Sequence, residues 1–166
     1  MFKAYKCFDK GLKNRYGDTF EIGKVYHASK DIKYGINGNG FHVCLNMEDT
    51  LRFFDALNEE VDICEVSCFG KSQRKDDEYY GYYDMYCVEN IIINRILERN
   101  EIIEHALDLS YNQAIHFIST YRLITEEIEL FKEKNKNNLT IMNYIRYYQE
   151  NDKEAFSIPK IKTLQP

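Results

Sequence analysis

The sequence predicts an α+β fold, in which a small, mostly antiparallel sheet with one short helix is followed by a helical C-terminal part. Short β-type runs separated by Gly and Asn turns fill the first 70 residues, and the run Ile91-Ile-Ile93 adds another strand. From about residue 99, apolar side chains instead recur every three or four residues. We therefore expect an α+β domain at residues 1–98, a helical part at 99–158 and an extended tail at 159–166.

Alternation of side chains predicts the opening strand. Within residues 2–8, Ala4 and Phe8 fall on one face, whereas Tyr5 and Cys7 fall on the other. Runs that are rich in β-branched and aromatic residues, bounded by turn residues, predict the other strands. These strands are expected at residues 24–28, 32–34, 41–45, 61–69 and 88–97.

Two connections stand out between these strands. The run Gly35-Ile-Asn-Gly-Asn-Gly40 is dense in residues that tolerate a positive φ, which predicts a tight reversal. It is not expected to hold a phosphate, because it opens a strand and lacks the G-x-x-x-x-G-K-[ST] pattern. Residues 71–78 are wholly polar or charged and predict a surface loop.

Helical spacing and capping residues predict the helices. Asn46 is a suitable N-cap for a short amphipathic helix at residues 47–58. Ser110 and Gln113 have the spacing of a capping box at the start of a later helix. Thr125 is expected to cap the next helix, and a last helix is expected around residues 141–148.

Composition limits the class of protein. The chain has 166 residues, which suits one domain, and its 14 tyrosines and 10 phenylalanines supply material for a packed core. No apolar run approaches the length of a membrane span, and the first residues lack the apolar segment of a signal peptide. We therefore expect a cytoplasmic protein that does not bind a membrane.

Charge is distributed unevenly along the chain. The net charge of −5 divides into +4 for residues 1–46, −7 for residues 47–100 and −2 for residues 101–166. Proteins that bind nucleic acid use a concentrated basic surface, which this chain does not show. The acidic middle is either a solvated face or a surface that meets a basic protein partner.

The sequence contains five cysteines and four histidines, the side chains most suited to metal binding or to nucleophilic and acid–base chemistry. An odd number of cysteines without framework spacing fits reduced, buried thiols better than disulfides. Cys64 and Cys68 form a single pair, whereas structural zinc sites use two, so no metal is expected. His42 follows the Gly-rich turn, where it either orients a loop or acts as a general base.

The run Glu78-Tyr-Tyr-Gly-Tyr-Tyr-Asp-Met-Tyr-Cys87 is the most unusual segment of the sequence. Tyrosine is favoured at protein–protein contacts, and acidic neighbours favour a protein over a nucleic acid as the partner. Alternatively, the rings simply cover the sheet. The expected partner-binding residues are Tyr79, Tyr80, Tyr82, Tyr83, Asp84 and Tyr86.

Four short motifs carry a resemblance to a known family. They are Tyr5-Lys-Cys-Phe-Asp9, Glu21-Ile-Gly-Lys-Val-Tyr26, Gly40-Phe-His-Val-Cys44 and Cys64-Glu-Val-Ser-Cys-Phe-Gly70. With them, residues 4–98 resemble a family of small uncharacterised domains found in bacteria and their phages, with a G-F-H-x-C motif. The resemblance implies a bacterial or prophage origin. It does not indicate a biochemical activity.

A second likeness concerns residues 40–70, whose order of Gly, strand, helix and strand looks like the core of ADP-ribosyltransferases. It implies NAD as a cofactor, with His42 and Glu89 as catalytic residues, although the usual triad of that family is not matched. We expect instead a cytosolic bacterial or phage protein that binds a protein, as an inhibitor or modulator of a host protein such as a defence system. That function needs no cofactor and no catalytic residue.

Overall fold

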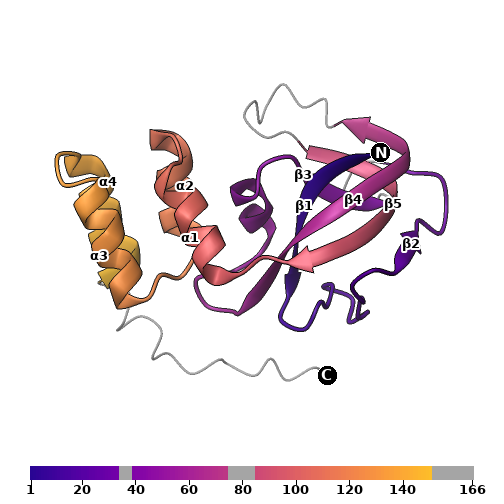
Figure 1. The fold of residues 1–166 in the computed structure, drawn as a ribbon, viewed down its shortest axis with the longest axis horizontal. Coiled ribbons are helices and arrows are strands. Elements are labelled where there is room, and N and C mark those ends of the chain that lie inside the picture. The colour runs from indigo at the N-terminus through magenta and orange to yellow at the C-terminus, as the bar shows by residue number, and fades with distance from the viewer. Residues whose placement is uncertain (34–38, 75–84, 151–166) are drawn as a thin grey trace, which may run out of the picture.

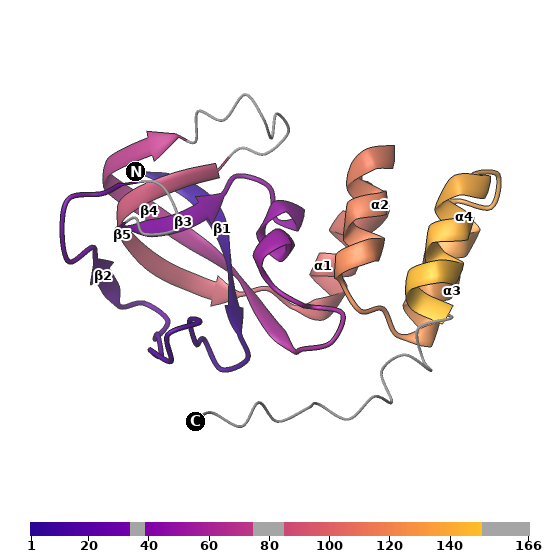
Figure 2. The same cartoon turned by 180° about the vertical axis from the view of Figure 1, so that it is seen from behind.

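The computed structural model describes residues 1–33, 39–74 and 85–150. It confirms the α+β fold: an antiparallel sheet built from the N-terminal part precedes four α-helices. Figures 1 and 2 show the sheet at one end of the molecule and the helices at the other. The expected tail at residues 159–166 lies outside the described residues.

Four of the five strands close into a small barrel. The strands are β1 (Phe2–Asp9), β2 (Val25–His27), β3 (Phe41–Cys44), β4 (Val61–Arg74) and β5 (Met85–Ile96). β1 pairs with β3 and β4, and β5 also pairs with β3 and β4, so the ladder returns to its start. β2 pairs with β5 alone. Closure removes most of the sheet edges that would otherwise be open to other chains.

Each face of β1 is buried, as its alternating pattern requires. Ala4 and Phe8 point into the barrel, where they join Val66, Ile91 and Ile93 in an apolar interior. Cys7 lies on the opposite face. There it joins a second core that includes Ile63 of β4, the turn after β3 and the helices. The predicted division of the strand is therefore confirmed.

β4 and β5 are both longer than the sequence predicted. Residues 71–74, which we expected in a loop, belong to β4, and residues 72–74 pair with β5. A register shift between Phe69 and Ser72 bends β4 at Gly70, whose φ is +81°. A Cβ atom there would lie 2.3 Å from Glu89 Oε2, so the bulge requires glycine. The sequence did not predict this part of β4, because its residues are polar and lie at an exposed sheet edge.

The ladder between β1 and β3 is short, and aromatic rings fill the space where it ends. Tyr5 opposite Cys44 is the one Cα pair between these strands. Phe20, from the connection between β1 and β2, packs against Phe8 at 5.1 Å and against Phe41 at 6.4 Å between ring centroids. We call this gap, between Lys6–Asp9 and Phe41–Val43, the β1–β3 seam.

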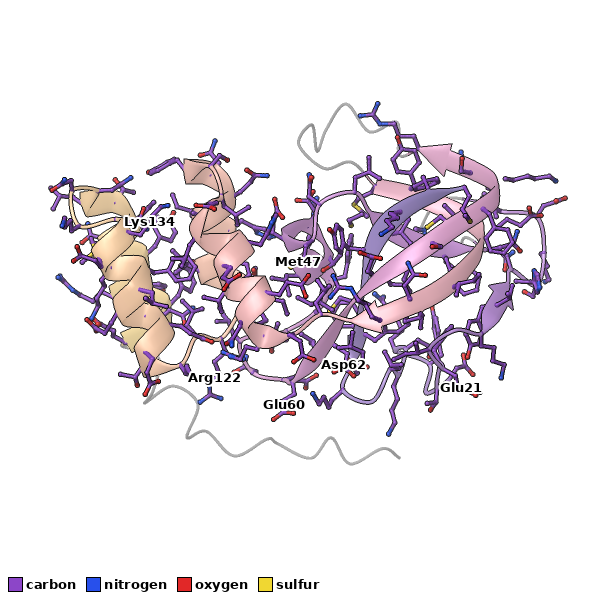
Figure 3. The ribbon with its side chains drawn as sticks, viewed as in Figure 1. Glu21, Met47, Glu60, Asp62, Arg122 and Lys134 are labelled. Atoms are coloured by element: carbon purple, nitrogen blue, oxygen red, sulfur yellow. The ribbon has the colours of Figure 1, made fainter. Side chains whose placement is uncertain are left out.

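The connection after β1 is held to the barrel by one buried carboxylate. Asp62 Oδ2 accepts hydrogen bonds from the backbone N–H groups of Gly11 (2.7 Å) and Leu12 (3.1 Å). Lys10 pairs with the other oxygen at 3.2 Å. Figure 3 shows Asp62 at the end of the barrel where this connection begins. A buried carboxylate with these donors is well satisfied.

A 3₁₀ turn replaces the predicted helix at residues 47–58. It is η1 (Glu48–Phe53), and it begins without a side-chain cap. The expected cap, Asn46, instead donates its amide to Asp49 Oδ2 at 3.0 Å. Met47 and Leu51 are buried between the barrel and the helices, and Figure 3 shows Met47 in this position. The apolar side chains whose spacing predicted a longer helix are thus buried by this shorter turn.

The predicted strand at residues 32–34 is reduced to a bridge between Lys33 and Asn39, and residue 34 lies outside the described residues.

The helical part is α1 (Arg99–Leu107), α2 (Tyr111–Thr120), α3 (Thr125–Lys134), α4 (Leu139–Ile145) and a π-helical turn η3 (Arg146–Glu150). Its apolar faces share one core with η1 and the outer face of the barrel. The capping box of Ser110 and Gln113 is present. Thr125 is the first residue of α3 instead of its cap, because Glu127 accepts the backbone N–H of Ile124. In the described residues, no helix is long and apolar enough to cross a membrane.

An ion pair between Arg99 and Glu127 connects α1 to α3. Arg99 donates two hydrogen bonds of 2.7 Å to the carboxylate of Glu127, which is 6% exposed. The same guanidinium donates to the carbonyl of Arg122 and lies over the ring of Tyr121. This bidentate geometry satisfies a buried carboxylate that would otherwise be costly.

The interior ring of Phe8 gives a direct test of the barrel core. We expect Phe8→Ala to lower the free energy of unfolding by about 3–5 kcal/mol, because a fully buried ring leaves a cavity. The matched control is Tyr16→Ala, whose ring is 79% exposed and which should change stability by less than about 0.5 kcal/mol. Urea denaturation of both variants measures the difference, and equal losses would contradict the assigned interior.

Candidate functional site

Lys6 is the polar side chain of β1 on the interior face of the barrel. It follows Ala4 and precedes Phe8 in the alternation that points into the core. Its Nζ donates to the backbone carbonyl of His42 at 3.0 Å and lies 5.3 Å from the centre of the Phe8 ring. The side chain thus crosses from β1 to β3 at the seam, where the backbone ladder between these strands ends.

Lys6 and His42 lie at this seam, and a third basic group, Arg15, affects the pKa of both. Burial lowers the pKa of Lys6, and the charge of Arg15 lowers it further, although the neighbouring thiols oppose this. Burial likewise lowers the pKa of His42, and both Lys6 and Arg15 add to the effect by repulsion. The three groups therefore lie close enough to sense one another's charge. We call Lys6, Arg15 and His42 the basic cluster.

Neither Lys6 nor Arg15 has a carboxylate partner among the described residues. No hydrogen bond or ion pair in the described ranges joins Lys6 or Arg15 to an acidic side chain. The charged neighbours that shift the Lys6 pKa are thiols and Arg15. A desolvated ammonium beside a second cation is unfavourable unless an anion compensates it.

The five cysteines are free thiols and all are buried. Burial raises the pKa of Cys44, Cys64 and Cys68 to about 12. It also raises the pKa of Cys7 and Cys87. The described residues contain no group of three or more His, Cys, Asp or Glu side chains with the geometry of a metal site. These thiols therefore act as small apolar side chains of the two cores.

The two residues of the predicted catalytic pair have different surroundings. Glu89 Oε2 accepts the backbone N–H of Lys71 at 2.9 Å, at the bulge of β4. His42 lies on β3 opposite Cys87, and its ring responds to the charges of Lys6 and Arg15. Glu89 therefore supports the bulge that Gly70 permits.

Most of the predicted partner-binding residues, namely Tyr79, Tyr80, Tyr82, Tyr83 and Asp84, lie outside the described residues. Tyr86 is described: it is half-buried on β5 and its ring lies 5.5 Å from that of Phe2, at the end of the barrel interior. Beyond Cys68, which pairs with Phe2, β4 continues to Arg74 with β5 as its one described partner strand. Residues 70–74 are exposed. We call residues 69–74 the β4 edge.

A buried carboxylate also joins the barrel to the helices. Glu48 of η1 is 1% exposed, and it contacts His105 Nε2 of α1 at 3.1 Å and accepts from Gln113 Nε2 of α2 at 2.6 Å. His116, also on α2, bonds to the backbone of Glu48, and burial lowers the pKa of its ring. These contacts fix α1 and α2 against η1.

Sequence reasoning missed the roles of Lys6, Arg15 and Glu48. The signal for Lys6 was its place on the apolar face of residues 2–8, where a lysine breaks the alternation. Arg15 gave no signal, because it lies in a connection whose path depends on the fold. The role of Glu48 depends on contacts with two later helices, which its position in the sequence does not indicate.

Comparison with protein-family models identifies one family. The family model described as a domain of unknown function, DUF7666, matches residues 2–105. The chain belongs to the DUF7666 family. The matched range contains the barrel, η1, the basic cluster and α1 as far as His105. Neither the curated proteins nor the solved structures give a match. The expected membership in an uncharacterised domain family is confirmed, whereas the G-F-H-x-C motif and the ADP-ribosyltransferase likeness stay predictions.

The thiols of this DUF7666 domain provide a test of the site. With a pKa of about 12, about one thiol in ten thousand is ionised at pH 8, and the thiolate is the reactive form. We expect Ellman's reagent to label almost no cysteine in the native protein within minutes and all five in guanidinium chloride. A cysteine that reacts rapidly in the native state would contradict the structural role assigned to the thiols.

Proposed function

We propose that this DUF7666 domain acts by binding a protein partner at the β4 edge, together with the Tyr-rich segment that follows it. One observation carries the proposal: β4 continues past Cys68, the last residue that pairs with β1, to Arg74, and residues 70–74 are exposed. Residues 64–68 of β4 pair with β1 on one side and with β5 on the other. An exposed strand edge presents backbone N–H and C=O groups to another chain.

Strand addition explains how such an edge would bind. A partner segment in extended conformation would continue the sheet through main-chain hydrogen bonds, and neighbouring side chains would supply specificity. The chain leaves β4 at Arg74 and enters β5 at Met85, so most of the Tyr-rich segment belongs to the connection that follows this edge in the sequence. Tyrosine rings provide a large contact area at low cost in conformational entropy. The positions Tyr79, Tyr80, Tyr82 and Tyr83 therefore suit the proposal.

The biological setting forms part of the same proposal. The resemblance to small domains of bacteria and phages supports a cytoplasmic protein that modulates a host protein, such as a component of a defence system. The acidic residues 76–78, which follow β4 in the sequence, support a partner with a basic surface. NAD turnover through His42 and Glu89 stays a prediction, and release of nicotinamide by the purified protein would test it.

A pull-down from bacterial lysate with tagged protein tests the proposal. We expect the triple variant Tyr80→Ala, Tyr82→Ala, Tyr83→Ala to lose the captured partner while its melting temperature stays within a few degrees of the parent. The control is Tyr147→Ala, an exposed tyrosine in the helical part, which should retain the partner. Mass spectrometry identifies what differs between the two samples.

Hydrogen exchange then locates the contact on the captured complex. Backbone amides of residues 70–74 should gain protection when the partner is bound, because strand addition places them in a new ladder. If the triple variant and the control capture the same proteins, or if the β4 edge exchanges equally with and without partner, the proposal is wrong.

A further inference from the structure

We propose that the junction between η1 and the helical part is acid-sensitive, and that α2 separates from η1 when this junction takes up a proton. The junction does not involve the β4 edge, so the proposal does not depend on the function proposed for that edge. Figures 1 and 2 both show η1 between the barrel and α2. A change in this contact would therefore alter how the helices pack on the barrel.

A buried carboxylate connects η1 to two helices. The Glu48 side chain is 2% exposed, and its two oxygens contact different partners. Oε2 lies 3.1 Å from Nε2 of His105 on α1, and Oε1 accepts a hydrogen bond of 2.6 Å from Nε2 of Gln113 on α2. Because both helices contact one residue of η1, a change at this residue affects α1 and α2 together.

His116 brings a second imidazole to the same residue. It follows Gln113 by three residues on α2, and its ring forms a hydrogen bond with the backbone of Glu48. The Nε2 atom of His116 has no contact with solvent. Burial lowers the pKa of this ring, and the charge of Arg52 lowers it further, although the bond to Glu48 and the Glu48 carboxylate oppose the change.

The other titratable groups at the junction come from four elements. Asp49 of η1 is buried like Glu48. Cys7 of β1 and Cys44 of β3 stay protonated, because burial raises the pKa of both thiols. His105 of α1 is 50% exposed, so its charged form keeps contact with water as well as with the Glu48 carboxylate. The buried ring of His116 is therefore the place where the junction opposes a proton.

The lowered pKa of His116 gives the direction of the effect. A histidine whose pKa is lower in the folded protein stabilises the folded state only while it is neutral. Its contribution is complete above the ordinary value of about 6.5 and is lost as the pH falls below that value. Acidification therefore favours a state in which the His116 ring reaches water, and separation of α2 from η1 produces such a state.

Two separate cores allow the helices to move while the barrel stays folded. The interior of the barrel, which contains Phe8 and Ile91, belongs to one core. Met47 and Leu51 of η1 belong to the other, together with the apolar faces of the helices. Separation would expose these two side chains, which are 3% and 0% exposed, and would create an apolar surface on the barrel.

Hydrogen exchange of the full-length protein at about pH 7.5 and about pH 5.5 tests the junction, with protection factors corrected for the intrinsic effect of pH. On acidification, we expect α2 amides to lose protection at least about threefold more than β1 amides. His116→Gln, which keeps a donor but carries no charge, should remove this difference. The matched control is His27→Gln, an exposed histidine of β2, which should respond like the parent.

NMR titration of the His116 ring in the parent keeps the proposal testable if His116→Gln does not fold. The ring should take up its proton below about pH 6.5, over the same range in which α2 loses protection. The proposal is wrong if α2 and β1 lose protection equally, if His116→Gln responds like the parent, or if the ring is protonated while α2 stays protected. The experiment needs no partner protein, so its failure is distinct from a failure of partner capture at the β4 edge.

Discussion

Closure of the sheet is the constraint on which the other features depend. Because β5 pairs with β3 on one side and β4 on the other, and β1 does the same, four strands enclose one apolar interior. Closure also turns the outer faces of β1 and β4 toward η1 and the helices, which form the second core. Within the described ranges, strand pairing is incomplete at two places, the β4 edge and the β1–β3 seam, and the proposed partner-binding site lies at the first.

Local patterns were sufficient for most of the fold. Alternation in residues 2–8 predicted both buried faces of β1, and the capping box at Ser110 predicted the start of α2. Patterns failed where a tertiary contact decides the conformation. Residues 71–74 are polar and read as a loop, but pairing with β5 makes them a strand. Asn46 has the chemistry of a cap, but Asp49 takes its amide.

The candidate site was harder to predict from the sequence, because its charged groups come near one another only when the barrel closes. Lys6, Arg15 and His42 belong to different segments, and no spacing in the sequence relates them. The lysine was visible as a break in an apolar face, but its neighbours were not. Glu48 shows the same limit, since its contacts to His105 and Gln113 are 57 and 65 residues away along the chain.

Cross-strand nuclear Overhauser effects in solution test the closed barrel and its seam most directly. We expect contacts between Tyr5 and Cys44 and between Cys68 and Ile91, which together close the ring. Backbone contacts between Cys7 and His42 should be absent, because the β1–β3 ladder ends before them. A continuous ladder through Cys7 and His42, or no contact between Tyr5 and Cys44, would contradict a closed barrel whose β1–β3 ladder is short.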